Sequence, residues 1–151
     1  MKFMMIIKSD KYAESGAMPS EKLLAAMGKY NEELVKAGVL LAGEGLHPSS
    51  RGARIRYENG KRTVIDGPFA EAKELIASFW MIQVKSKEEA IEWARRVPFE
   101  AGDDMPHEGP GEIELRQVFE MADFSPELYQ SEEARAALDS ERAFRERTGQ
   151  E

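Results

Sequence analysis

The chain has 151 residues, of which 21 are basic and 28 acidic, so its formal net charge is −7 and its pI is near 5.1. This length suits one domain with a sizeable core, and the absence of cysteine excludes thiol catalysis, disulfides and cysteine-ligated metal centres. The acidic balance argues against general nucleic-acid binding, which needs a cationic face. No apolar run suits a signal peptide or a membrane span. We therefore expect a cytoplasmic protein with no direct nucleic-acid partner and no membrane partner.

The first third of the chain predicts a strand, a helix and a second strand. The short apolar run at 3–7 is typical of a buried strand, and the composition of residues 9–19 indicates a loop. Apolar residues then repeat at helical spacing over 21–37. Ser20 is a helix-capping residue and Gly38 suits a position just past a helix end, which supports these bounds. Residues 39–42 are expected to form a strand that Gly43-Glu44-Gly45 interrupts.

The middle of the chain predicts a hairpin, a strand and a second helix. Residues 53–58 and 62–66 flank Asn59-Gly60, the strongest short signal for a β-hairpin. A short helical turn is expected within 70–75 and an apolar strand over 79–84. Ser86 and Glu89 have capping-box spacing ahead of a helix that Pro98 ends. Glycine and proline in 100–112 indicate a loop, and 113–121 predicts the last strand.

The C-terminal part of the chain differs in composition from the rest. Ser125-Pro126-Glu127 is typical of a helix start, and we expect a terminal helix over 127–146. From Asp123 to Glu151 there are eight acidic and four basic residues. We therefore expect a domain over 1–124 and a C-terminal helical extension over 125–151. The element order before the extension predicts an α+β fold, with an antiparallel sheet that carries its helices on one face.

The predicted strand 79–84 is apolar on both faces. Trp80 and Ile82 lie on one face of this strand, and Phe79 and Met81 on the other. Helices are expected to cover only one of these faces. A homodimer that pairs through the second sheet face is therefore expected.

The segment Asp66-Gly67-Pro68-Phe69-Ala70-Glu71-Ala72-Lys73-Glu74 resembles the signature of the DGPF, or YCII-related, family. Ala37-Gly38-Val39-Leu40 with Gly43-Glu44, Glu89-Ala90-Ile91-Glu92-Trp93-Ala94 and Ile113-Glu114-Leu115-Arg116-Gln117-Val118 also resemble the family pattern. The likeness covers about residues 1–124. It implies a ferredoxin-like domain that pairs into a dimeric α/β barrel. The family resemblance points to no firmly established reaction. It implies that some relatives are associated with extracytoplasmic-function sigma factors.

The chain departs from this resemblance at one point. A His–Asp pair proposed for the related small YCII proteins would place a histidine on the first helix and an aspartate before Pro-Phe. Here residues 21–37 contain no histidine, and Val97 precedes Pro98-Phe99. The role of that pair therefore does not carry over. The polar residues of the pattern that remain are Glu44, Asp66, Glu71, Lys73 and Glu74.

The turn Asp66-Gly67-Pro68-Phe69 has a structural interpretation and a functional one. In the first, Asp66 caps the turn, Gly67 adopts a positive φ and Phe69 anchors the turn in the core. In the second, Asp66 faces a pocket in the barrel and acts with Glu44 as a catalytic carboxylate. Glu71 and Lys73 would then bind the substrate, with Lys73 holding an anionic group. In the structural interpretation, Lys73 only forms a solvated ion pair with a nearby carboxylate.

Two further clusters are candidate binding sites. Glu44 and His47 have the spacing of metal ligands on a helix, but the neighbouring glycine and proline argue against a helix there. His107 lies in the acidic loop 103–108. We expect neither a metal nor a cofactor. The basic residues around the hairpin indicate either a solvated strand face or a contact with an anion or nucleic acid. They are Arg51, Arg54, Arg56, Lys61 and Arg62.

The sequence leaves two classes of function open, and it does not decide whether the protein is an enzyme. The first is the binding or transformation of a small polar metabolite, in a barrel pocket that contains Asp66 and Glu44. The alternative is a non-catalytic interaction module linked to extracytoplasmic-function sigma-factor regulation. Buried, converging carboxylates beside a cavity would favour the first class, and a filled barrel with an exposed apolar patch the second.

Overall fold

The computed structural model describes residues 1–103, 105–125 and 129–148. The chain divides into two compact units, residues 1–118 and 119–151, which are described separately. The first unit contains the main sheet, its helices and the predicted hairpin.

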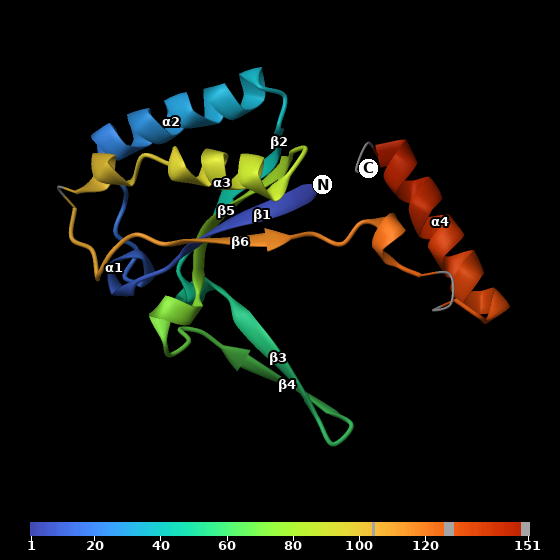
Figure 1. Cartoon of the computed structure of the whole chain (residues 1–151). Coiled ribbons are helices and arrows are strands. Elements are labelled where there is room, and N and C mark those ends of the chain that lie inside the picture. Colours follow the sequence, from blue (N-terminus) through green and yellow to red (C-terminus); the bar gives the residue numbers. More distant parts are fainter. Residues whose placement is uncertain (104, 126–128, 149–151) are drawn as a thin grey trace. The chain divides into compact units, whose positions relative to one another are not determined.

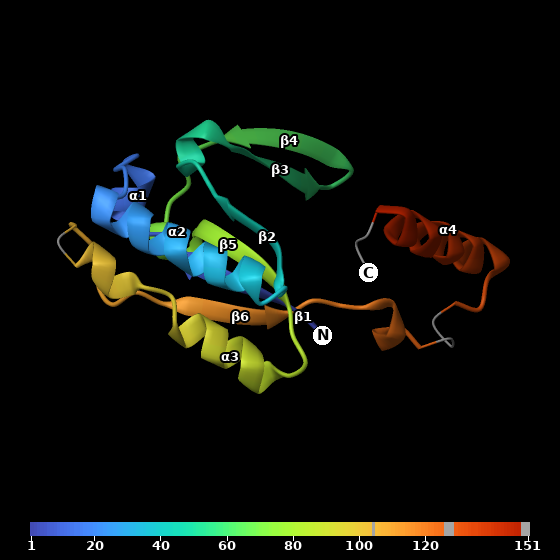
Figure 2. The ribbon, with the colours of Figure 1, turned by 90° about the horizontal axis from the view of Figure 1, so that it is seen from above.

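Four antiparallel strands form the main sheet, in the spatial order β2-β5-β1-β6. The strands are β1 (Lys2–Lys8), β2 (Leu40–Gly45), β5 (Ile76–Gln83) and β6 (Ile113–Gln117). Helix α2 (Glu21–Lys36) precedes β2, and helix α3 (Lys87–Arg95) connects β5 to β6. Both helices cover the same face of the sheet (Figures 1 and 2). This is a ferredoxin-like α+β fold, as the sequence predicts.

Both long helices of this unit begin after the serines that the sequence indicates. Ser20 Oγ accepts a hydrogen bond from the Leu23 amide at 3.2 Å, and Ser86 Oγ accepts one from the Glu89 amide at 3.2 Å. The Glu89 carboxylate in turn accepts a hydrogen bond from the Lys85 amide at 2.8 Å. These bonds satisfy amide groups that have no partner within the helix, so they fix where each helix starts.

The core lies between the sheet and the helices α2 and α3. Its buried side chains are Phe3, Met5, Tyr30, Leu34, Val39, Trp80, Ile82, Val84, Ala90, Trp93 and Val97. Tyr30 contacts Trp80 and Trp93, with ring centroids 5.5 and 6.5 Å apart, and its hydroxyl donates a hydrogen bond to the Trp93 carbonyl at 2.8 Å. Burial of the phenol raises the pKa of Tyr30 to about 12.

Strand ends differ from the predicted spans, most clearly in β2, β5 and β6. Strand β2 continues through Gly43-Glu44-Gly45 instead of being interrupted there. Gly43 makes this possible, because a Cβ at this position would lie 2.7 Å from Cδ1 of Trp80. Strand β5 begins at Ile76, which pairs with Lys8 of β1, and not at residue 79. Strand β6 ends at Gln117, short of the predicted residue 121.

Short helical segments occur in the connections. Residues 9–19, predicted as a loop, contain helix α1 (Lys11–Glu14). Asp10 stabilises this turn because its carboxylate accepts hydrogen bonds from the amides of Tyr12 and Ala13 at 2.9 and 2.8 Å. The short helical turn expected within 70–75 is confirmed as η2. The 3₁₀ segments of this unit are η1 (Ser49–Arg51), η2 (Ala72–Glu74) and η3 (Phe99–Gly102).

Strands β3 (Ala53–Glu58) and β4 (Lys61–Asp66) form the predicted hairpin, which is a separate two-stranded sheet. Its turn residues Asn59 and Gly60 have φ values of +49° and +74°, as a type I′ turn requires. The hairpin lies beyond β2, on the side of the main sheet away from α2 and α3 (Figures 1 and 2). Apart from Ile65, every residue of the two strands is exposed.

The face of the main sheet opposite α2 and α3, called here the second sheet face, has an apolar centre. Met4 pairs with Met81 and Ile6 with Phe79, and alternation along the strands points these side chains away from the core. Ile6 is buried and the other three are half-buried. The predicted two-sided apolar character of strand 79–84 is therefore confirmed.

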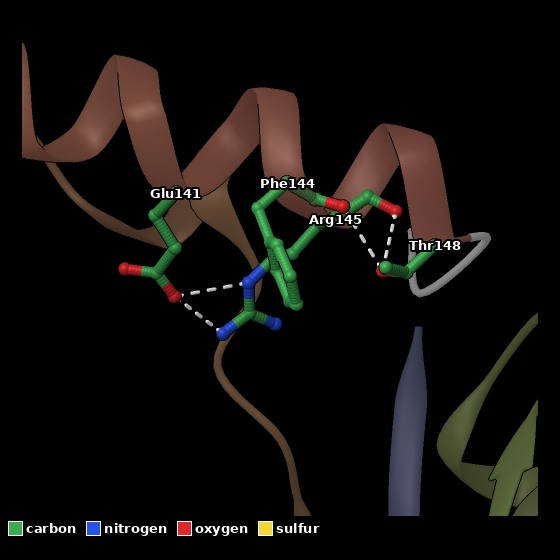
Figure 3. A network of polar contacts seen from close by, with 4 residues as sticks. All are labelled: Glu141, Phe144, Arg145 and Thr148. Carbon is green, nitrogen blue, oxygen red and sulfur yellow. Dashed lines mark hydrogen bonds and ion pairs between the residues drawn. The ribbon is translucent and has the colours of Figure 1, made fainter.

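The second unit contains η4 (Met121–Asp123) and helix α4 (Glu132–Thr148). The predicted terminal helix is confirmed but begins later than residue 127, because Ser131 Oγ accepts a hydrogen bond from the Ala134 amide at 3.1 Å and caps it. Residues 126–128, on which the predicted start falls, lie outside the described residues. Arg145 donates two hydrogen bonds to Glu141 Oε1, at 3.0 and 2.6 Å (Figure 3).

Candidate functional site

The turn that follows β4 packs its backbone against the segment between β2 and β3. The amide of Gly67 donates a hydrogen bond to the Gly52 carbonyl at 3.0 Å, and the Gly67–Pro68 peptide is cis. A Cβ on Gly67 would lie 1.8 Å from the carbonyl oxygen of Ser49. The φ of Gly67 is not positive, so the expected reason for this glycine is wrong. The turn needs glycine because of this close backbone approach.

A network of hydrogen bonds around Ser49 holds the same turn from the other side. Ser49 Oγ accepts a hydrogen bond from the Phe69 amide at 3.0 Å and donates one to Glu14 Oε2 at 2.5 Å. The Ser49 amide also donates to Glu14 Oε2, at 3.0 Å. Glu14 in α1 and Ser49 in η1 thus position the Asp66-Gly67-Pro68-Phe69 turn. No local sequence pattern indicates these contacts, because Glu14 and Ser49 are 35 positions apart and Ser49 and Phe69 are 20 positions apart in the chain.

Asp66 is the last residue of β4 and pairs with Ala53 at the base of the hairpin. Its side chain is exposed. Among the residues that the structure describes, none donates a hydrogen bond to its carboxylate, so the expected cap of the turn by this side chain is not formed. The Asp66 carboxylate is available to a ligand or to water.

Phe69 is half-buried, and the guanidinium of Arg54 lies 4.0 Å from the centroid of its ring. Stacking of a guanidinium on an aromatic face is favourable. Arg62 lies 5.5 Å from the ring centroid of Tyr57, and Arg51 lies 3.2 Å from Nε2 of His47. Three residues of the predicted basic cluster therefore contact aromatic or imidazole rings near the hairpin.

Glu44 lies on the second sheet face, because it pairs with Phe79 in the ladder between β2 and β5. Its side chain is exposed. The chain continues from the end of β2 to η1, the segment against which Gly67 packs. The end of β2 and the turn that begins at Asp66 therefore belong to one region of the first unit.

Glu71 and Lys73 lie in the connection between this turn and β5. Glu71 is exposed and has a φ of +62°, which is uncommon for a residue with a side chain. Lys73 lies in η2, is exposed and forms no ion pair with any described residue. Its ammonium group is therefore free to meet an anionic group, and the expected solvated ion pair is not formed within the described chain.

Charged side chains also border the second sheet face along β6. Glu114 pairs with Ile6, accepts a hydrogen bond from Arg116 at 3.1 Å and forms an ion pair with Lys8 at 3.5 Å. The hydrogen bond from the Arg116 guanidinium, with a contribution from Lys8, holds the pKa of Glu114 below its usual value. The border of this face at β6 thus carries charges of both signs.

Within the described residues, neither histidine lies in a cluster of possible metal ligands. His47 and His107 are exposed, and His107 Nδ1 lies 2.9 Å from the Gly109 carbonyl oxygen. Across residues 1–103, 105–125 and 129–148, no three histidine or acidic side chains are placed to share a metal ion. Asp104, part of the acidic loop 103–108, lies outside the described residues. Within the described ranges, every helix is too short or too polar to cross a membrane.

The fold and the turn at Asp66 agree with one family. The YCII-related domain matches residues 1–122, so the chain belongs to this family. The chain is also 35% identical over 75 residues to the uncharacterized protein R00369 of Rhizobium meliloti (strain 1021). That match covers 50% of this chain and 60% of the relative.

Proposed function

We propose that the protein is a homodimer whose second sheet faces pack together and enclose a site for a small polar metabolite. The position of Glu44 carries this proposal. Its carboxylate stands on the same sheet face as Phe79 and Met81, which are apolar. Pairing of this face with that of a second copy would enclose a polar group within an apolar wall, which is the usual composition of a small-molecule site.

Three other polar residues of the family pattern, Asp66, Glu71 and Lys73, would lie at the edge of the proposed site. Asp66, at the base of the hairpin, has an exposed carboxylate that offers further hydrogen-bond acceptors. Lys73 supplies a cation with no ion-pair partner in the described chain, and Glu71 precedes it in the same connection. A cation at this edge would offset the net charge of −7, which otherwise repels an anionic ligand.

The chemistry of this site is that of carboxylates. A carboxylate enclosed in a dimer and within hydrogen-bond distance of a bound molecule can accept a proton from it. Glu44 is the first candidate for this role, and Asp66 the second. The same groups serve equally for binding without reaction, so binding is the primary claim.

A non-catalytic interaction module is the second candidate function. The exposed apolar side chains of the hairpin favour it, since a protein partner would cover them. The family resemblance implies extracytoplasmic-function sigma factors as this partner class. This alternative predicts that the protein binds no metabolite.

A thermal-shift screen tests the proposal directly. Amino acids, hydroxy acids, sugars and sugar phosphates would each be added to the wild-type protein, and the unfolding midpoint recorded. We expect at least one compound to raise the midpoint of the wild type. The rise should be lost in Glu44→Gln and Asp66→Asn, which keep the shape of the side chains. Glu58→Gln, an exposed carboxylate near the hairpin tip, is the matched control and should keep the rise.

Light scattering on the same samples tests the assembly. A homodimer at micromolar concentration is expected for the wild type and for the three variants. A stable monomer would contradict the proposed enclosure of Glu44. A dimer that no compound stabilises would favour the interaction module.

A further inference from the structure

The hairpin carries an apolar stripe that stays largely exposed in the described chain. The ladder between β3 and β4 pairs Ile55 with Val64 and Tyr57 with Arg62, so Ile55, Tyr57 and Val64 share one face. Their exposed fractions are 49%, 72% and 65%. We call these three residues the arm stripe and residues 51–66 the arm.

The arm depends on few contacts of its own. In the described part of the chain, β3 and β4 pair only with each other. A two-stranded hairpin that stands alone in water is only marginally stable. A protein surface that packs on the arm stripe would therefore stabilise the hairpin, because it removes apolar surface from water.

The charge of the arm indicates what kind of surface covers it. The arm holds five basic and two acidic residues, which gives +3. Outside the arm, the rest of residues 1–118, called here the body, holds 12 basic and 17 acidic residues, which gives −5. The body of a second copy of this chain is thus electrostatically complementary to the arm.

The arm also offers contact area beyond that of the second sheet face. A stable interface takes about 800 Å² from each partner. A large side chain has about 200 Å² of surface, and Ile6 is buried while Met4, Phe79 and Met81 are half-buried, so these four side chains alone supply only part of this area. The arm lies on the same side of the sheet as this face (Figure 1). It is therefore placed to extend the same interface.

We propose that the hairpin is a dimerisation arm, which lays Ile55, Tyr57 and Val64 against the acidic body of a second copy. This inference rests on the homodimer of the proposed function. Nucleic acid suits the arm less well than a second copy does, because the chain is acidic overall and the arm stripe is apolar. The arm would thus form an interface between two copies, in addition to the sheet faces.

Sedimentation equilibrium of the full chain tests the arm. In the double variant Tyr57→Thr, Val64→Thr, threonine keeps the preference for a strand and removes most of the apolar surface. We expect its dimer dissociation constant to rise at least tenfold over that of the wild type. Glu58→Thr, on the opposite face of the hairpin, is the matched control and should change the constant by less than about threefold.

Two measurements on the wild type keep the test valid if the double variant folds poorly. Hydroxyl-radical labelling of Tyr57 should fall when the concentration is raised from below to above the dissociation constant. The dimer should also weaken as sodium chloride is raised, because salt screens the attraction between arm and body. Equal labelling at both concentrations would overturn the proposal.

The remaining outcomes separate this inference from the ligand site. A double variant that dimerises like the wild type overturns the arm and leaves the metabolite site standing. A dimer that depends on the arm but binds no compound overturns the metabolite site and supports the arm. Binding of a labelled DNA duplex that is lost in the double variant would assign the stripe to nucleic acid and overturn the proposal.

Discussion

Gly67 and Ser49 are in direct backbone contact, 18 positions apart in the chain: a Cβ on Gly67 would lie 1.8 Å from the Ser49 carbonyl oxygen and 2.5 Å from its carbonyl carbon. Real Cβ atoms do not approach a backbone group so closely. The turn after β4 therefore fits against η1 only if this position lacks a side chain. The contact joins the segment containing Asp66 to the segment that follows Glu44.

Gly67→Ala should therefore destabilise the protein by about 2 kcal/mol or more, since overpacking typically costs about 1–3 kcal/mol and here the obstacle is backbone. Lys73→Ala should stay within about 0.5 kcal/mol because Lys73 is exposed. Gly45→Ala is the matched glycine control, since a Cβ there has no atom within 4 Å. Chemical denaturation of the three variants measures these differences. Equal stability of Gly67→Ala and Lys73→Ala would refute the contact.

Tyr30 should make stability depend on pH in the alkaline range. Burial raises the pKa of its phenol from 10.0 to about 12. Between these two values the unfolded chain loses the phenol proton while the folded protein keeps it. The stability contribution is therefore fully present below pH 10 and falls as pH rises from 10 to 12, by about 1.4 kcal/mol per unit.

Tyr30→Phe removes this titration together with the hydrogen bond to the Trp93 carbonyl, which is worth about 1 kcal/mol. The wild type should therefore be the more stable protein at about pH 9, and its advantage should shrink as the pH rises toward 12. Unfolding free energies of both proteins across this range provide the measurement. An advantage that stays constant would show that the phenol titrates alike in the folded and unfolded states.

Glu71 adopts a φ of +62°, where a side chain costs about 1 kcal/mol or more. Glu71→Gly relieves this strain, whereas Glu74→Gly in the same connection only adds freedom to the unfolded chain. We expect Glu71→Gly to be the more stable of the two variants by about 1 kcal/mol. Thermal unfolding compares them, and the opposite order would argue against the left-handed conformation of Glu71.

Local signals in the sequence were enough for most of the fold. Asn59-Gly60 predicts the type I′ turn because both residues tolerate a positive φ, and Ser20 and Ser86 predict helix starts because their hydroxyls bond to nearby amides. These features depend on residues within a few positions of one another. Alternation in 79–84 likewise predicts that Phe79 lies on the second sheet face.

The contacts around the candidate site could not be predicted in this way. Glu14, Ser49 and Phe69 meet only because the fold brings α1, η1 and the turn together. Strand β2 can continue through residue 43 because Gly43 has no Cβ in the space that the Trp80 indole fills. This contact joins two different strands, so the local sequence does not reveal it. The burial of Glu44 in the proposed dimer depends on a second chain, so no pattern within one chain specifies it.

Titration calorimetry tests the central claim most directly. The compound with the largest thermal shift would be titrated into the wild type, Glu44→Gln, Asp66→Asn and the control Glu58→Gln. We predict one molecule bound per protomer in the wild type and in the control, and no measurable heat of binding in Glu44→Gln and Asp66→Asn. Unchanged affinity in Glu44→Gln would contradict the assignment of the site to the second sheet face.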